Sequence, residues 1–313
     1  MRPRRSAALA LVGAGLAACG VPEDRGLTRP HGVPATPFVQ RDLRLAALDD
    51  VRIRYVDEGP RDAPAALLIP GHTSRIEEYD ALTRALSDRF RVLVLDYPGS
   101  GYADKPVRDY DLTYYEDVSM ALLDALGVER AHLVGGSLGG NLVLRLARRS
   151  PERFDRLAPW APGGAWQAQP RLARAMRAIA SYAAFRPIVW IQSRYWYDES
   201  FAGRDQKLAD TFAYYREVMG PGFVRMYFGM AATQVEQSLF TIAPEIEHPV
   251  WLGWGDRDHG ANMGEGVARL HELLPRSELH VFPGAGHALA SEVPDALAAA
   301  IGTFLTRPAD ELP

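Results

Sequence analysis

Short β-type runs alternate with amphipathic helical stretches from about residue 38 onward, and this alternation limits the fold more than any other feature of the sequence. It is typical of an α/β protein, in which a mostly parallel sheet carries helices on both faces. The apolar runs at 65–69 and 92–95 indicate central strands that are buried on both sides. We predict a doubly wound sheet of eight strands, near residues 39–45, 51–56, 65–69, 91–95, 131–134, 154–159, 249–254 and 278–282. Helices are expected at roughly 77–88, 113–126, 138–149, 262–274 and 293–306.

About 85 residues between the strands near 154–159 and 249–254 do not follow this alternation. They are rich in aromatic residues and arginine, which predicts a helical cap inserted into the sheet domain at 163–244. The core then consists of residues 38–162 and 245–313. We expect most aromatic side chains of the cap to pack against the core, and a few to line a cavity beneath the cap.

The first 20 residues have the composition of an export signal. Arginines at positions 2, 4 and 5 precede an apolar run from Ala7 to Ala18, which is too short to cross a bilayer as a helix. Residues 1–18 are therefore predicted to be a signal peptide.

The end of this signal, Leu16-Ala17-Ala18-Cys19, resembles the lipobox of bacterial lipoproteins. In such proteins the chain is cleaved before the cysteine, whose thiol receives a diacylglycerol group. The resemblance implies lipidation of Cys19, export to the bacterial cell envelope and a lipid anchor in the membrane, with residues 19–37 as a tether. The alternative is an ordinary secreted signal followed by a chance cysteine. Cys19 is the only cysteine, so no disulfide can form within the chain.

The charge pattern names no macromolecular partner. The formal net charge is −4, and no run of like charges suggests a nucleic-acid surface or an acidic tail. The sequence shows no clustered His, Cys and carboxylate set of the kind that a zinc site requires, and no glycine loop that would hold a phosphate. We therefore expect no metal, no organic cofactor and no nucleic-acid partner, whereas the oligomeric state stays open.

The pentapeptide Gly135-Gly136-Ser137-Leu138-Gly139 lies directly after a predicted strand and directly before a predicted helix. A turn this sharp forces Ser137 into a strained backbone conformation that only small neighbours permit. Its hydroxyl is then exposed at the helix N-terminus, where the helix dipole favours developing negative charge. We predict Ser137 to be a nucleophile; the alternative is a serine in an ordinary turn.

A serine hydroxyl is a weak nucleophile at neutral pH and needs a base within hydrogen-bonding distance. His287 is the best candidate, because it ends a glycine-rich loop, Phe282-Pro283-Gly284-Ala285-Gly286-His287, after the last predicted strand. His259, in a loop beside a candidate acid, is its rival. Most other histidines lie in the tether, in predicted strands or in a predicted helix.

The loop after the predicted strand 249–254 offers two carboxylates, Asp256 and Asp258, as the acid that orients the base. Such an acid holds the imidazole in the required tautomer and stabilises the imidazolium that forms during the reaction. Alternation along the chain does not distinguish the two. Either could also be a solvated turn residue, and this alternative is favoured for Asp256.

With these motifs, the sequence resembles the α/β-hydrolase superfamily over residues 40–306. The order Ser137, Asp258, His287 along the chain matches the order of that family's catalytic triad. In relatives of this kind the acid lies three residues after the glycine of a Trp-Gly pair, which selects Asp258. The resemblance thus implies the α/β-hydrolase fold, with Ser137 as nucleophile, Asp258 as acid and His287 as general base.

Two more segments fit the resemblance. Residues 96–106 look like the loop that follows the family's fourth strand and forms part of the cavity wall. Pro70-Gly71-His72 takes the place of the family's His-Gly-X oxyanion loop, with proline where histidine is usual. Because oxyanion donors are backbone amides, this departure should leave the hole intact, and position assigns the amides of His72 and Leu138. Whether the His72 side chain faces substrate or solvent stays open.

These assignments predict a serine hydrolase that works through an acyl-enzyme. The aromatic cap favours carboxylic esters with a small to medium, partly apolar acyl or alcohol group. The resemblance also covers hydrolases of carbon–carbon bonds in ring-fission products, aminopeptidases that act on N-terminal proline, and cofactor-free peroxidases. Haloalkane dehalogenases and epoxide hydrolases are similar too, but they carry Asp where this chain has Ser137.

Two other hypotheses stay open. The chain could be a non-catalytic binding lipoprotein of the cell envelope, although all three triad residue types are retained. It could also be an enzyme whose substrate is a lipid in the membrane that holds Cys19. An anchor locates an enzyme, however, without defining its substrate.

Overall fold

The computed structural model describes residues 36–259 and 263–313, so the predicted signal peptide, Cys19 and almost all of the tether lie outside the described residues. Eight strands form one sheet: β1 (Gln40–Leu45), β2 (Val51–Glu58), β3 (Ala65–Ile69), β4 (Arg91–Asp96), β5 (Ala131–Gly136), β6 (Phe154–Trp160), β7 (Val250–Gly255) and β8 (Ser277–Phe282). Their order is β1-β2-β4-β3-β5-β6-β7-β8. β2 runs antiparallel to both neighbours, and the other pairs are parallel. The predicted mostly parallel, doubly wound sheet is confirmed.

Each strand begins and ends within two residues of its predicted position. All five residues of β3 are buried, as are all residues of β4 except Arg91, which agrees with their prediction as central strands. β5 extends two residues beyond the prediction because Gly135 and Gly136 pair with Pro159 and Trp160 of β6. This extension carries the strand directly into Ser137.

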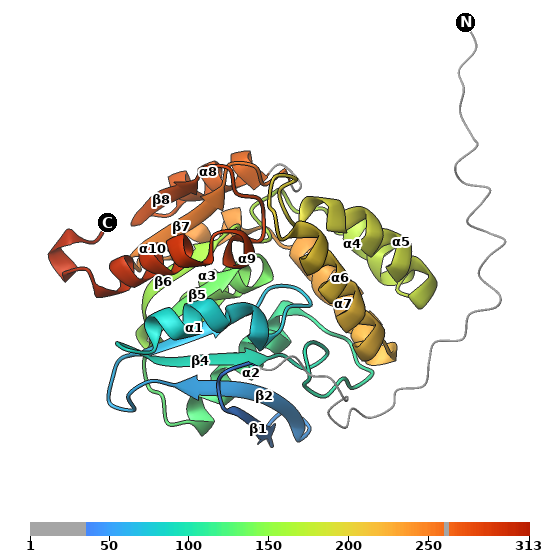
Figure 1. Ribbon diagram of the computed structural model, residues 1–313, viewed down its shortest axis with the longest axis horizontal. Helices are drawn as coiled ribbons and strands as arrows, with labels where there is room; N and C mark the ends of the chain where they lie inside the picture. Colours follow the sequence, from blue (N-terminus) through green and yellow to red (C-terminus); the bar gives the residue numbers. More distant parts are fainter. Residues whose placement is uncertain (1–35, 260–262) are drawn as a thin grey trace, which may run out of the picture.

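Helices cover both faces of the sheet (Figure 1). One core contains the apolar sides of α2 (Leu112–Ala125), α3 (Leu138–Arg149) and α8 (Met263–Leu273). The other core contains those of α1 (Asp80–Leu86), α9 (Leu289–Glu292) and α10 (Pro294–Thr306). Neighbouring residues of a strand alternate between the two cores, as Leu67 and Leu68 do in β3. Within the described ranges, no helix is long and apolar enough to cross a bilayer.

The single helix predicted at 77–88 is wrong in its first turn. A 3₁₀ turn at Ile76–Tyr79 precedes α1. The Ile76 amide donates to Oδ1 of Asp96 at 3.0 Å, and the Tyr79 hydroxyl donates to the Ile69 carbonyl at 3.1 Å. Because these contacts tie the turn to the sheet, Tyr79 takes φ −106° and ψ 5°, outside α-helical geometry.

Four helices lie between β6 and β7 in the chain: α4 (Pro170–Ala178), α5 (Tyr182–Gln192), α6 (Arg204–Val218) and α7 (Pro221–Glu236). We call them the cap; they lie to the right of the sheet in Figure 1. Much of their packing is aromatic, since the Phe185 ring meets those of Tyr215, Phe223 and Tyr227 edge-on, with centroids 4.8–5.6 Å apart. The predicted domain boundaries at 163 and 244 stay a prediction.

A buried ion cluster supports the loops at the carboxyl ends of the strands. Arg54 is 1% exposed, and its guanidinium pairs with Asp96 at 2.6 Å and with Glu77 at 2.7 Å. The same Asp96 carboxylate accepts hydrogen bonds from the amides of Ile76 and Tyr102 at 3.0 and 2.8 Å. One side chain therefore connects the loop after β3 with the loop after β4.

Candidate active site

Ser137 forms the turn between β5 and α3, with φ 54° and ψ −118°. A positive φ is unusual for a residue with a side chain, and such strain is common at functional turns. Backbone hydrogen bonds hold it: the Ser137 amide donates to the Trp160 carbonyl at 3.0 Å, and the Ser137 carbonyl accepts from the amides of Asn141 and Gly163 at 3.0 and 2.9 Å. The predicted nucleophile therefore has a fixed backbone.

Two glycines beside Ser137 allow this turn to fit. A Cβ atom on Gly139 would lie 1.9 Å from the carbonyl oxygen of Ile69, which is a backbone atom of β3. A Cβ atom on Gly136 would lie 2.2 Å from the indole of Trp160. Both distances are far below van der Waals contact. The turn therefore requires glycine at position 139, where it passes close to β3, and at position 136, where it passes close to β6.

His287 and Asp258 come together from different loops. Nδ1 of His287, after β8, lies 2.7 Å from Oδ2 of Asp258, after β7. The Asp258 side chain is 0% exposed and that of His287 is 23% exposed. Burial lowers the pKa of His287, but attraction to Asp258, their hydrogen bond and the charge of Glu292 outweigh burial and raise it above its ordinary value. The imidazole is therefore a stronger base than a free histidine.

The other candidate acid and base lie elsewhere. Asp256 is exposed, and its Oδ1 accepts a hydrogen bond from the Gly284 amide at 2.7 Å. It thus holds the loop that carries His287 without contacting the imidazole. His259 is also exposed and does not line the cavity that contains Ser137. Of the two carboxylates, the structure places Asp258 against the imidazole.

The loop after β3 brings the predicted oxyanion donors to Ser137. The Cβ position of Gly71 lies 3.6 Å from Cβ of Ser137, and His72 follows at the cavity wall. Leu138 is the first residue of α3, so its amide has no carbonyl partner within that helix. The amides of His72 and Leu138 are close to the serine, and their role as donors stays a prediction.

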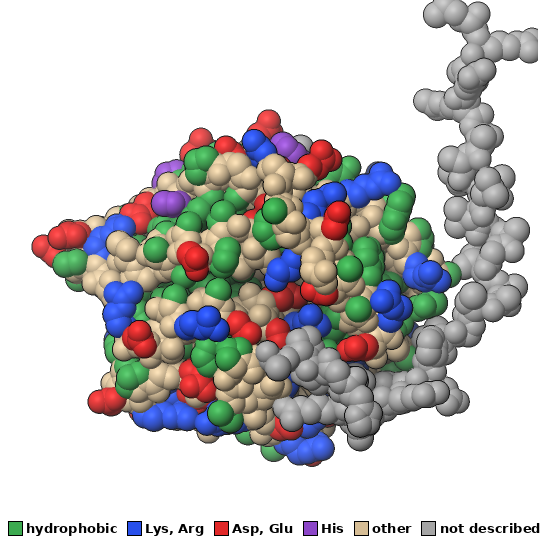
Figure 2. Space-filling model, in the orientation of Figure 1, with side chains coloured by type: hydrophobic (Ala, Val, Ile, Leu, Met, Phe, Trp, Pro, Cys, Tyr) green, Lys and Arg blue, Asp and Glu red, His purple; other side chains and the backbone are tan. Residues whose placement is uncertain are grey.

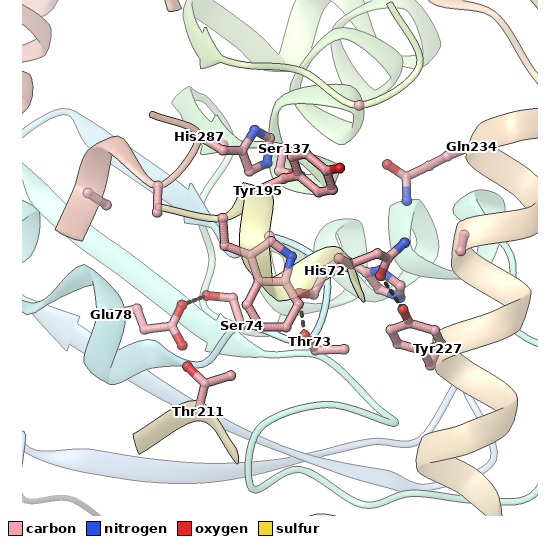
Figure 3. A pocket seen from close by; sticks show the side chains of 18 of the residues that line it. His72, Thr73, Ser74, Glu78, Ser137, Tyr195, Thr211, Tyr227, Gln234 and His287 are labelled. Carbon is pink, nitrogen blue, oxygen red and sulfur yellow. Dashed lines mark hydrogen bonds between the residues drawn. The ribbon is translucent and has the colours of Figure 1, made fainter. Parts of the chain in front are cut away.

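The His72 side chain, whose direction the sequence left open, packs against the cap. Its ring stacks on that of Tyr227 with centroids 4.8 Å apart (Figure 3). Burial lowers the pKa of His72 to about 4, although a backbone hydrogen bond to Tyr227 opposes this shift. The ring is therefore neutral at neutral pH. Its Nε2 is buried and has no hydrogen-bond partner among the described residues.

A cavity of about 530 Å³ lies between the strand ends and the cap, and both Ser137 and His287 line it (Figure 3). Much of its wall is apolar, from Trp166, Leu172, Met176, Tyr195, Trp196 and Val235. Polar side chains also reach it, from Ser74, Glu78, Gln169, Gln192, Thr211 and Gln234. This mixture suits a partly apolar ligand with a few polar groups.

Glu78 is a cavity residue that the sequence analysis missed. It accepts a hydrogen bond from the Ser74 hydroxyl, and the two lie on the Thr211 side of the cavity in Figure 3. Burial raises the pKa of Glu78, and the hydrogen bond from Ser74 and the charges of Arg75 and Lys207 partly oppose the rise. No signal in the sequence distinguishes Glu78 from its neighbour Glu77, which pairs with Arg54 instead.

In residues 36–259 and 263–313, no group of three or more His, Cys, Asp or Glu side chains is arranged to hold a metal ion. The Ser137 hydroxyl and the His287 imidazole both line the cavity, and the buried Asp258 carboxylate contacts the imidazole. Together they can activate an oxygen nucleophile.

Comparison with known proteins identifies the family to which the chain belongs. A family model described as "Alpha/beta hydrolase family" matches residues 66–300. Among curated proteins, the chain is 29% identical over 263 residues to haloalkane dehalogenase 2 of Mycobacterium tuberculosis, covering 80% of this chain and 90% of the relative.

Two solved structures are similar over most of the chain. The enol-lactonase from Burkholderia xenovorans LB400 has a TM-score of 0.72 and 23% identity, covering 85% of this chain and all of the other. A membrane phospholipase A, described as a bacterial virulence factor, has a TM-score of 0.69 and 25% identity, covering 86% of each chain. These similarities agree with the fold that the strand order defines.

Proposed function

Because the chain belongs to the alpha/beta hydrolase family, we propose that it is a serine hydrolase that cleaves carboxylic esters through an acyl-enzyme. One observation carries this proposal: Ser137, at a strained turn, and His287 line the same cavity, and the buried Asp258 accepts a hydrogen bond from Nδ1 of His287. The turn exposes a hydroxyl at a helix N-terminus, and the buried carboxylate raises the basicity of the imidazole.

In the proposed mechanism, the Ser137 oxygen attacks the acyl carbon while Nε2 of His287 takes the hydroxyl proton. We assign the Nε2 lone pair to this step because Nδ1 of His287 carries the hydrogen atom that is hydrogen-bonded to Asp258. The imidazolium then protonates the leaving alcohol, and the acyl group stays on Ser137. Water, deprotonated by His287, cleaves this ester and restores the free serine.

Negative charge develops on the carbonyl oxygen during both attacks. In this proposal, the amides of His72 and Leu138 bind that oxygen, and a donor of this kind typically contributes about 3 kcal/mol to transition-state stabilisation. The α3 dipole adds to this effect, since Leu138 begins the helix.

The size and lining of the cavity favour small to medium, partly apolar esters as substrates. About 530 Å³ accommodates a small organic molecule, and the aromatic wall favours an apolar acyl or alcohol group. Similarity to a membrane phospholipase A keeps lipid-like esters among the candidates. We do not propose dehalogenation, which is named for one relative, because resemblance to haloalkane dehalogenases implies Asp at the nucleophile position, where this chain carries Ser137.

We also propose that the protein is a lipoprotein of the bacterial cell envelope, anchored through Cys19. The support is the sequence Leu16-Ala17-Ala18-Cys19 after an apolar run. Cys19→Ala should release the protein from the membrane fraction of expressing bacteria without changing turnover per mole. Unchanged fractionation would rule out lipidation as the anchor.

Hydrolysis of a p-nitrophenyl ester series from acetate to palmitate tests the reaction, with Ser137→Ala as the matched control. Turnover that disappears in the control supports the proposal, and the preferred chain length measures the acyl site. Turnover that persists in Ser137→Ala removes the serine from the mechanism. If no ester is cleaved, carbon–carbon and peptide substrates come next.

Labelling with a fluorophosphonate separates an enzyme from a non-catalytic binding protein, because the reagent reacts with an activated serine. We expect an adduct on Ser137 in the folded protein and none after denaturation. A folded protein that forms no adduct would favour the binding function.

A further inference from the structure

Exposed apolar side chains are concentrated on one part of the cap. Eight large apolar side chains are exposed in the described parts of the chain, and five of them lie between residues 172 and 195. Each of the five is between 46% and 56% exposed: Leu172, Ile179, Trp190, Ile191 and Tyr195. They belong to α4 and the residue that caps its C-terminus, to α5, and to the 3₁₀ turn Ser193–Tyr195. We call this segment, residues 170–195, the α4–α5 face.

The α4–α5 face is also strongly basic. Residues 161–197 contain five arginines and no Asp or Glu, although the whole chain has a formal charge of −4. All five are exposed: Arg171, Arg174, Arg177, Arg186 and Arg194. Arg177 pairs with Glu236 on α7 at 2.5 Å, and the Arg194 guanidinium lies 4.1 Å from the centre of the Trp190 ring. Positive charge therefore surrounds the exposed apolar groups.

The inner sides of these helices fix the face in place. Ala173 of α4, and Phe185 and Val189 of α5, are buried, and α4 packs along α7. In Figure 1, α4 and α5 form the outer edge of the cap, and Figure 2 shows hydrophobic and basic side chains together along that edge. The exposed apolar groups thus point away from the core.

We propose that the α4–α5 face docks the protein on an anionic lipid bilayer. Tryptophan and tyrosine rings favour the boundary between headgroups and acyl chains. An arginine can lay its apolar stem along this boundary while its guanidinium binds phosphate. The five arginines are spread along both helices and the 3₁₀ turn after α5, so an extended layer of phosphate groups complements them better than one acidic site on a protein.

Docking in this way directs the cavity toward the bilayer. Leu172 and Tyr195 are exposed on the α4–α5 face and also line the cavity. The same side chains thus belong to the docking face and to the cavity wall. An apolar ester can then pass from the bilayer to Ser137 along an apolar path. This consequence rests on the proposed serine hydrolase function, whereas the docking does not.

Co-sedimentation with vesicles tests the proposal, using residues 20–313. This form keeps every strand and helix of the described structure and lacks Cys19, so a lipid anchor cannot cause binding. Phosphatidylcholine vesicles are compared with vesicles that also contain phosphatidylglycerol. The variants are Trp190→Ser and the double charge reversal Arg174→Glu with Arg194→Glu. The matched controls, Val107→Ser and Arg84→Glu, change exposed residues outside the face.

We expect binding to the phosphatidylglycerol vesicles that rising salt weakens, that falls about tenfold in both variants and that is unchanged in both controls. No binding to these vesicles, or equal binding by wild type and variants, overturns the proposal. A dimer in light scattering that Trp190→Ser abolishes, without vesicle binding, assigns the face to a second copy and also overturns it. Turnover of a short water-soluble ester should not change in Trp190→Ser. The vesicle assay measures binding without turnover, so its result stands even if the protein cleaves no ester.

Discussion

The Asp258 carboxylate is fully buried and accepts the Nδ1–H of His287 at 2.7 Å, whereas Asp256, two residues earlier in the same loop, is exposed. A buried carboxylate interacts more strongly with a developing imidazolium than an exposed one, because water screens it less. The two aspartates therefore differ in environment although they share a loop.

Asp258→Asn should lower kcat/KM for the best p-nitrophenyl ester by about 10³- to 10⁴-fold, because an amide neither fixes the tautomer nor stabilises the imidazolium. Asp256→Asn should change it far less, since Asp256 contacts the Gly284 amide and not the imidazole. Steady-state kinetics of both variants check this. The reverse order would move the acid to Asp256.

The pH dependence of turnover should follow His287. In the proposed mechanism the neutral imidazole is the base, so kcat/KM should rise with pH as the ring loses its proton. Since Asp258 raises the pKa of His287, the midpoint should lie above 6.5, and it should fall in Asp258→Asn. A pH–rate profile of both proteins measures the two midpoints. A wild-type midpoint at or below 6.5 would contradict the assignment.

The same pKa shift has an effect on folding with a defined sign. The folded-state pKa of His287 is higher than its unfolded value, so the stabilising contribution is present below about pH 6.5. It is lost as the pH rises through the folded-state pKa. The free energy of unfolding of wild type should therefore fall over that interval relative to Asp258→Asn, as denaturant titrations at several pH values can measure.

Adjacent glutamates should respond oppositely to the same substitution. Burial raises the pKa of Glu78, so its carboxylate costs stability at neutral pH, and Glu78→Gln should raise Tm by roughly 2 °C. This gain should shrink as the pH falls below 4.5, where the unfolded carboxyl is also protonated. Burial raises the pKa of Glu77 as well, but its carboxylate pairs with the buried Arg54 guanidinium at 2.7 Å. Glu77→Gln should therefore cost about 2 kcal/mol, because it leaves that buried charge with a weaker partner. Thermal unfolding of both variants at neutral and acid pH compares them, and equal Tm changes would disprove the distinction.

Gly139→Ala should destabilise the protein by about 2–4 kcal/mol, because the added Cβ would meet the Ile69 carbonyl at 1.9 Å. Esterase activity should fall as well, since the displaced turn carries Ser137. Gly127→Ala is the control: Gly127 has φ 64° but open space around its Cβ position, so only backbone strain of about 1 kcal/mol is expected. Denaturant unfolding and ester turnover measure both variants; equal destabilisation would contradict the steric argument.

The sheet could be predicted because buried strands have a recognisable pattern of apolar residues in the sequence. β3 and β4 are short apolar runs without alternation, as expected for strands that are covered on both faces. The turn at Ser137 was equally visible, since its glycines record close approaches of β3 and β6 that no side chain permits.

Other parts of the site needed spatial information. Alternation could not separate Asp256 from Asp258, because both lie in a loop; the family resemblance selected Asp258, and the structure places it against His287. Glu78 was missed because Glu77 and Glu78 look alike in sequence. Their directions depend on the 3₁₀ turn, which long-range contacts of Ile76 and Tyr79 impose. Side-chain directions in the cap, including the stacking of Tyr227 on His72, were not predictable for the same reason.

The shared Asp96 carboxylate has a consequence for how this fold can diversify. It holds the amide of Ile76, in the loop after β3 that lines the cavity, and that of Tyr102, in the loop after β4, which does not line it, and it is neutralised by Arg54 from β2. A substitution that moves the Asp96 side chain affects both loops, because each loop is hydrogen-bonded to one oxygen of the same carboxylate. Through this carboxylate, a substitution in the loop after β4 can alter the position of the loop that lines the cavity, so residues outside the cavity wall can also influence which substrate fits.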